Sequence, residues 1–293
     1  MINAALVLEG GSLRTLFTSG VLDVFMQNNL EFACVIGASA GALNGANYVA
    51  KHIGRSARIN TIHSNDANYF GLKQLVTKRN AFNFDYLFGE PINHLYPYDE
   101  AALANSKQRF LIAATDCETG GVTYFERRDY QGMAEALQAS SSIPMLNKFV
   151  YIDGKPYTDG GVAEAIGLHK AVQEGYDRIV LVLTRDIGFR KSGVPKLQAS
   201  LYRRAFDKYP ELIEALMTIP DRYNALVEEI QRLERAGKIF VVRPRQSINI
   251  KVMERDARKL LDLYFRGRDE ATALLPQMQE YIYGRSFQNA RAQ

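Results

Sequence analysis

The sequence predicts an α/β protein built around a parallel sheet. Two apolar runs at residues 4–8 and 32–36 are short enough to be buried strands, and helical patterns of apolar residues follow each, at residues 13–27 and from residue 40 onward. A strand–helix–strand–helix order is typical of parallel strands joined by right-handed crossovers. At 293 residues the chain is long enough for one large domain with a modest extension.

Further strands are expected at residues 109–114, 122–125 and 179–183, with a helix at 163–174 before the last of them. The sheet should therefore span at least the first 185 residues. Residues 149–158 read as a hairpin because Asp153-Gly154 is a strong turn signal. Such a hairpin would deliver Asp159 to the rim of the sheet.

The character of the chain changes at about residue 195. Long helical patterns follow at residues 197–217, 221–236, 253–265 and 270–283, interrupted by one strand candidate at 238–243. We therefore expect one domain over residues 1–195 and a mostly helical extension over residues 196–293. The extension has three open roles: to cover a cleft in the first domain, to dock on a membrane or partner, or to complete the core.

Composition narrows the class of protein. Hydrophobic residues make up 47% of the chain and charged residues 23%, as in folded globular proteins. The N-terminus lacks a basic signal-peptide region, and no uninterrupted apolar run is long enough to span a membrane. Two cysteines, Cys34 and Cys117, fit a reducing compartment and give no zinc spacing. We expect a cytoplasmic protein without a metal site, and a net charge of +4 is too mild to predict a nucleic-acid partner.

A candidate nucleophile lies between the second strand and the helix that follows it. Gly37-Ala38-Ser39-Ala40-Gly41 has the G-x-S-x-G pattern of a nucleophile elbow. The flanking glycines, Gly37 and Gly41, allow a sharp turn that exposes the serine hydroxyl, and the following helix N-terminus favours developing negative charge. The alternative is an ordinary turn of small residues, because the pentapeptide alone is a weak signal.

A second turn, after the first strand, offers backbone donors for an oxyanion. Gly10-Gly11-Ser12-Leu13-Arg14 should lie on the same rim as Ser39, since neighbouring parallel strands end together. A dinucleotide fingerprint fails because Ser12 and Thr15 occupy its second and third glycine positions, and no phosphate-loop lysine follows. Arg14 would either hold this loop by a hydrogen bond or contact an anionic substrate group.

The candidate base is Asp159, which is followed by Gly160 and Gly161. Its rival, Asp153, is better explained by the hairpin turn. Histidine is scarce, with His52, His63, His94 and His169 the whole supply. Only His169 follows Asp159 as an α/β-hydrolase triad requires, and its place in a surface helical pattern fits that role poorly.

In order and spacing, these three motifs resemble those of the patatin-like phospholipases. Two further blocks are similar to that family: Ala114-Thr115-Asp116 leading to Gly120, and Ala139-Ser140-Ser141-Ser142-Ile143-Pro144. The resemblance covers roughly residues 4–185, and the helical tail is similar to that of bacterial cytoplasmic members. It implies a three-layer α/β/α fold and a Ser–Asp dyad without a catalytic histidine or a cofactor.

Carried onto this chain, the resemblance assigns the nucleophile to Ser39, the base to Asp159 and the oxyanion loop to residues 10–14. The chain departs from the family pattern at Ser12 and Thr15, where the family prefers glycine. The implied function is a serine lipid acyl hydrolase of the phospholipase A or esterase type, with a lipid or acyl ester as substrate and room for transient contact with a membrane surface. An acyltransferase using the same acyl-enzyme and a non-catalytic lipid-binding protein remain alternatives.

Overall fold

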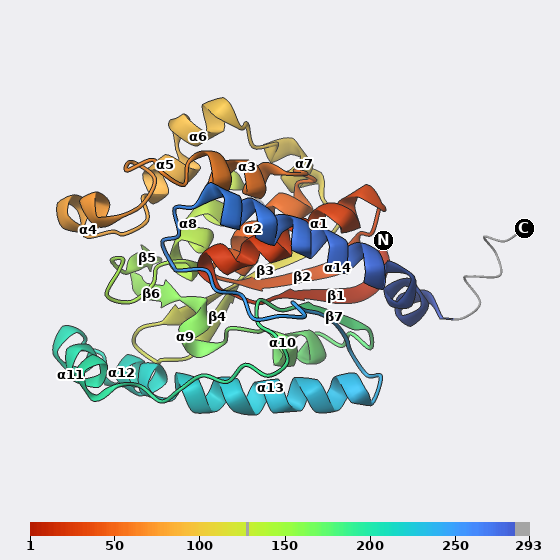
Figure 1. Ribbon diagram of the computed structural model, residues 1–293. Coiled ribbons are helices and arrows are strands. Elements are labelled where there is room, and N and C mark those ends of the chain that lie inside the picture. Colours follow the sequence, from red (N-terminus) through yellow and green to blue (C-terminus); the bar gives the residue numbers. More distant parts are fainter. Residues whose placement is uncertain (127–128, 285–293) are drawn as a thin grey trace, which may run out of the picture.

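The computed structural model describes residues 1–126 and 129–284. One eight-stranded sheet runs in the order β5-β6-β3-β2-β1-β7-β8, with β4 paired to β3 (Figure 1). Five neighbouring strands are parallel, and three antiparallel strands extend one side of the sheet. The parallel strands are β1 (Ile2–Leu8), β2 (Phe32–Ala38), β3 (Arg109–Asp116), β7 (Ile179–Val182) and β8 (Phe240–Val242); the others are β4 (Val122–Phe125), β5 (Val150–Ile152) and β6 (Lys155–Asp159).

Helices cover both faces of this sheet, which confirms the three-layer α/β/α fold (Figure 1). Strand β1 shows why two cores form, because side chains alternate between the faces of a strand. Leu6 belongs to the larger core and Val7 to the smaller one. The larger core is covered by α1 (Leu16–Gln27), α2 (Ala40–Val49) and α14 (Ala257–Tyr283), and the smaller one by α10 (Leu168–Gln173) and α13 (Ile219–Arg235).

A group of short helices lies over one end of the larger core, in a region for which the sequence patterns predict no element. Figure 1 shows most of them stacked above α2. They are α3 (Arg55–Ile62), α4 (Leu72–Lys78), α5 (Phe84–Phe88), α6 (Glu90–Leu95) and α7 (Glu100–Asn105), with α8 (Tyr130–Ser140) against the sheet.

The strands lie where the sequence predicts them, but the helix predictions are wrong at three places. The expected helix at 163–174 is split into α9 (Gly160–Ala163) and α10, because Glu164 leaves the helical conformation with a φ of −152° and a ψ of 99°. The expected helix at 197–217 is also two, α11 (Lys196–Ala205) and α12 (Pro210–Met217), since Pro210 starts a new helix. The helices expected at 253–265 and 270–283 form one continuous helix, α14.

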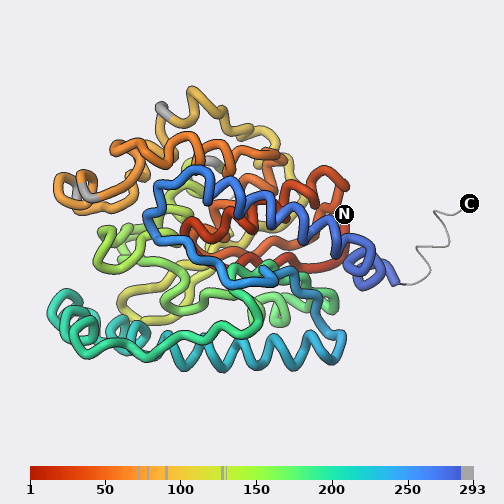
Figure 2. Tube along the Cα trace, in the orientation of Figure 1, coloured from red at the N-terminus to blue at the C-terminus, as the bar shows by residue number. Residues whose placement is uncertain are grey.

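The region after residue 195 is built into the sheet and the larger core. Strand β8 pairs with β7, and α14 runs beside α1 (Figure 2). The Tyr281 hydroxyl of α14 accepts a hydrogen bond from the Ile179 amide at 3.0 Å and donates one to the Lys238 carbonyl at 2.9 Å. The domain boundary at residue 195 stays a prediction. Within residues 1–126 and 129–284, no helix is long and apolar enough to cross a membrane.

Candidate active site

Ser39 occupies a sharp turn between β2 and α2. Its φ angle is 53°, in the left-handed region that a residue with a side chain rarely adopts. The two expected glycines make the turn possible. A Cβ on Gly41 would lie 2.5 Å from the carbonyl oxygen of Leu8, and one on Gly37 would lie 2.7 Å from the Cα of Ala42. The turn therefore has the backbone geometry of a nucleophile elbow.

Asp159 faces Ser39 from the end of the β5–β6 hairpin. Ser39 Oγ donates a hydrogen bond to Asp159 Oδ2 at 2.6 Å, while Asp159 Oδ1 accepts one from the Gly161 amide at 2.7 Å. Gly160 is needed because a Cβ there would lie 2.2 Å from the carbonyl oxygen of Ala113. The hairpin turn at Asp153 forms as expected, so the rival carboxylate is confined to that turn.

Burial changes the acidity of this carboxyl group. Asp159 is only 7% exposed, and its loss of solvation raises its pKa from 3.8 to about 6. Hydrogen bonds from Ser39 and Gly161 oppose the shift, as does the positive charge of Lys191. A carboxylate with a pKa near 6 is ionised at neutral pH and is a stronger base than an exposed aspartate.

Three hydroxyl-bearing residues hold the dyad in place, and the sequence reasoning assigned them no role. The Ser39 amide donates to Ser140 Oγ at 2.8 Å, and Thr115 Oγ1 donates to the Asp159 carbonyl at 2.8 Å. The Asp159 amide donates to the Ser142 carbonyl at 3.0 Å. All three lie in the two further blocks that resemble the family, so that similarity was the available signal.

The region after residue 195 also supports the segment around Asp159. Arg222 of α13 donates hydrogen bonds to the carbonyls of Val162, at 2.6 Å, and Ala163. Both carbonyls belong to α9, the turn directly after Asp159. A residue beyond position 195 therefore holds the turn that follows Asp159, and no local sequence pattern predicts this contact.

The glycine-rich loop lies directly beside Ser39. A Cβ on Gly10 would be 3.2 Å from Ser39 Cβ, and the Gly10 amide donates to the Ala165 carbonyl at 3.2 Å. Gly10 therefore positions the loop, although its amide was expected among the oxyanion donors. The amides of Gly11, Ser12 and Leu13 donate no hydrogen bond within the described part of the chain. They remain the candidate oxyanion donors.

Ser12 adopts the conformation for which the family prefers glycine. Its φ angle is 50°, and its hydroxyl donates to the Val252 carbonyl at 3.0 Å. Arg14 Nη2 would lie 3.1 Å from a Cβ placed on Gly11, so the guanidinium lies beside the loop. Arg14 Nε is buried and has no hydrogen-bond partner in the described residues. The hydrogen bond expected to hold the loop is thus not provided by Arg14 Nε, and loop support by Arg14 stays a prediction.

A buried tyrosine of α13 lies behind this loop. Tyr223 is 6% exposed, and its hydroxyl donates to Glu9 Oε1 at 2.8 Å. Glu9 Oε2 accepts from the Thr184 amide at 2.6 Å. The buried Glu9 carboxylate therefore joins β1, the end of β7 and α13 directly behind the oxyanion loop.

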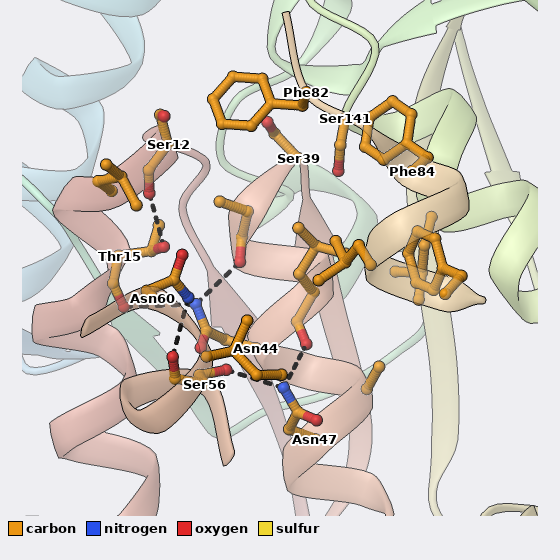
Figure 3. Close-up of a pocket in the computed structure, with 18 of the residues that line it drawn as sticks. Ser12, Thr15, Ser39, Asn44, Asn47, Ser56, Asn60, Phe82, Phe84 and Ser141 are labelled. Carbon is orange, nitrogen blue, oxygen red and sulfur yellow. Dashed lines mark hydrogen bonds between the residues drawn. The ribbon is translucent and has the colours of Figure 1, made fainter. Parts of the chain in front are cut away.

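A pocket opens beside Ser39 (Figure 3). Ser12 and Leu13 line it together with apolar and aromatic side chains from the short helices and the segment before α5, including Phe84 and Phe82. Ser141 also lines the pocket, and its buried hydroxyl has no hydrogen-bond partner among the described residues. In the sequence, this wall is signalled by the aromatic-rich segment at 82–88, for which no role was predicted.

The four histidines bond to groups other than the dyad or lie at the surface. His169 is exposed on α10 as expected, and His94 is exposed on α6. Within the described residues, no cluster of three or more His, Cys, Asp or Glu side chains is placed to hold a metal ion. The bonded pairs are His52 Nε2 with the Asp99 amide at 2.8 Å, His63 Nδ1 with the Tyr86 hydroxyl at 3.1 Å, and His169 Nε2 with Glu229 Oε2 at 2.8 Å.

Comparison with known families agrees with this geometry. The model of the patatin-like phospholipases matches residues 6–172. The chain belongs to this family. A second family model, described as a domain of unknown function (DUF6363), matches residues 209–283.

One curated protein and one solved structure were found to be similar to parts of this patatin-like protein. The uncharacterized protein YjjU of Escherichia coli (strain K12) is 30% identical over 184 residues, which is 61% of this chain and 51% of YjjU. The chain thus spans about half the length of that relative. VipD from Legionella pneumophila superimposes with a TM-score of 0.46 at 12% identity, over 94% of this chain and 66% of VipD.

Proposed function

We propose that the protein is a serine lipid acyl hydrolase, of the phospholipase A or esterase type, that works through a Ser39–Asp159 dyad. The observation that carries the proposal is the 2.6 Å hydrogen bond from Ser39 Oγ to Asp159 Oδ2 at the edge of an apolar pocket. Membership of the patatin-like phospholipase family supports the substrate class.

We place the enzyme in the cytoplasm, where its two free, buried cysteines stay reduced.

The reaction proceeds through an acyl-enzyme. Ser39 Oγ attacks the ester carbonyl carbon as its proton passes to Asp159, and the negative charge on the carbonyl oxygen is bound by amides of the glycine-rich loop. Collapse of this intermediate releases the alcohol, which takes the proton from Asp159. Water then attacks the acyl-enzyme, gives its proton to Asp159, and the fatty acid leaves as Ser39 regains a proton.

The test is covalent labelling with a fluorophosphonate probe. The native protein should be labelled, whereas Ser39→Ala, with the same circular dichroism spectrum, should not. Labelling of Ser39→Ala to the same extent would refute the assignment. Failure of the folded native protein to react would favour the non-catalytic lipid-binding alternative.

Substrate assays then establish the reaction. Fatty acyl esters or phospholipids should be cleaved equally with and without a chelator, because the dyad mechanism needs no calcium. Activity confined to peptides, or lost on chelation, would contradict the substrate class or the mechanism. Acyl transfer to an added alcohol in preference to water would assign the acyltransferase alternative.

A further inference from the structure

The pocket beside Ser39 follows one face of helix α2. Ser39, Leu43 and Asn47 all line it, and their spacing of four residues places them on the same side of the helix. Asn47 therefore lies about 12 Å from Ser39 along the helix axis, at a rise of 1.5 Å per residue. The pocket extends from the nucleophile to a point two turns along α2.

Much of the pocket wall suits a hydrocarbon chain. Aliphatic and aromatic side chains come from the glycine-rich loop, the 82–88 segment, α8 and the residues just after α8. Apolar walls of this kind favour burial of methylene groups. The side chains are Leu13, Phe82, Phe84, Leu87, Phe88, Met133, Leu137 and Ile143.

At the far end of the pocket, three polar side chains are joined by hydrogen bonds. Asn47 Nδ2 donates to Ser56 Oγ at 2.8 Å, and Arg55 Nη1 donates to Asn47 Oδ1 at 3.2 Å. Asn47 and Arg55 are 9% and 7% exposed. Figure 3 shows Asn47 and Ser56 at the end of the pocket opposite Ser39 and Phe82. We call Asn47, Arg55 and Ser56 the polar partition.

A second, small cavity lies behind the polar partition. It shares Asn44, Asn47 and Ser56 with the main pocket and is lined beyond them by residues that include Asp23. The shared side chains therefore separate two spaces. A hydrocarbon chain that reached this point would have to break the hydrogen bonds of Asn47 without replacing them, which is unfavourable for buried polar groups.

We propose that the polar partition limits the length of the acyl chain, so that the enzyme selects medium-chain acyl groups over long-chain ones. This inference rests on the proposed function. An extended chain advances about 3.5 Å per three bonds, so a 12 Å slot accepts roughly ten chain atoms. Each methylene up to that length should raise kcat/KM by about fourfold, and further methylenes should lower it.

The test is the chain-length profile of kcat/KM for p-nitrophenyl butyrate, octanoate, decanoate, dodecanoate and palmitate, with each ester solubilised at the same concentration of the same detergent. The native protein should prefer octanoate or decanoate to palmitate by about tenfold or more. Preference for palmitate would overturn the inference. Ser39-dependent cleavage of butyrate would uphold the proposed function in either case, whereas a native protein that cleaves none of the esters would overturn both.

Two pocket variants move the limit in opposite directions. Leu43→Phe fills the slot about 6 Å from Ser39 along α2 and should raise the butyrate-to-octanoate ratio by about tenfold. Asn47→Ala opens the polar partition toward the second cavity and should raise the dodecanoate-to-octanoate ratio. These ratios do not depend on the folded fraction of a preparation. Leu197→Phe, on the exposed face of α11, is the matched control and should leave the profile unchanged. Native ratios in both pocket variants would overturn the inference.

Discussion

Ser39 Oγ donates directly to Asp159 Oδ2, with 2.6 Å between the two oxygens, so the described structure places no histidine between nucleophile and carboxylate. Asp159→Asn should therefore lower kcat by several orders of magnitude, because an amide cannot accept the serine proton. Alanine at His52, His63, His94 or His169 should keep activity within about tenfold, since loss of a triad member costs far more. A folded histidine variant as inactive as Asp159→Asn would replace the dyad by a triad.

The acidity of Asp159 predicts a pH profile. Because burial raises its pKa to about 6, the carboxyl group is protonated below that pH and cannot accept the proton of Ser39. We expect kcat/KM to fall about tenfold per pH unit below the pKa and to level off above it. Steady-state kinetics between about pH 4 and pH 9, with stability checked at each pH, measure this. A flat acidic limb would show that Asp159 is not the base.

The same shift predicts a cost to folding. A carboxyl pKa raised from 3.8 to about 6 means that the folded state binds the proton more tightly than the unfolded chain does. The resulting decrease in the free energy of unfolding is absent below about pH 4 and grows as the pH rises to about 6. Above that pH it is constant, on the order of 3 kcal/mol. Asp159→Asn should therefore be more stable to urea than the native protein at about pH 8, and the difference should shrink toward pH 4. Equal stability at both pH values would contradict this reading of the site.

The glycine-rich loop gives a kinetic prediction. A Cβ on Gly11 would lie 2.8 Å from Thr184 Oγ1, so Gly11→Val should displace the loop amides. Loss of one oxyanion donor typically lowers kcat by about a hundredfold or more, with a smaller effect on KM, because the interaction develops in the transition state. Ser12→Gly is the control: it suits the positive φ at that position and should keep kcat within about threefold. Normal turnover by Gly11→Val would remove the loop from the mechanism.

The contact between α1 and α14 predicts the effect of a distant glycine on stability. A Cβ on Gly267 would lie 2.0 Å from the Phe17 carbonyl oxygen, so the two helices touch through backbone. Gly267→Val should lower the free energy of unfolding by about 2 kcal/mol or more through overpacking. Ala273→Val, on an exposed position of the same helix, should have little effect. Similar urea midpoints for both variants would mean that the contact adds no stability.

The sequence by itself determined the local parts of the site. Gly37, Ser39 and Gly41 mark a strand-to-helix turn, and Asp153-Gly154 marks the hairpin that ends at Asp159. These features follow from backbone preferences of a few consecutive residues, and side-chain periodicity places the strands beside them. The fold class and the two residues of the proposed dyad could therefore be named from the sequence.

Only the tertiary structure decided how these parts meet. Ser39 and Asp159 are 120 residues apart in the sequence. The hydrogen bond from the Gly10 amide to the Ala165 carbonyl likewise joins two distant segments. Part of the pocket wall comes from short helices that the sequence patterns do not predict, and Gly267 of α14 lies against the Phe17 carbonyl of α1. Contacts between distant segments leave no signal in any single stretch of sequence, because they arise when whole elements pack together.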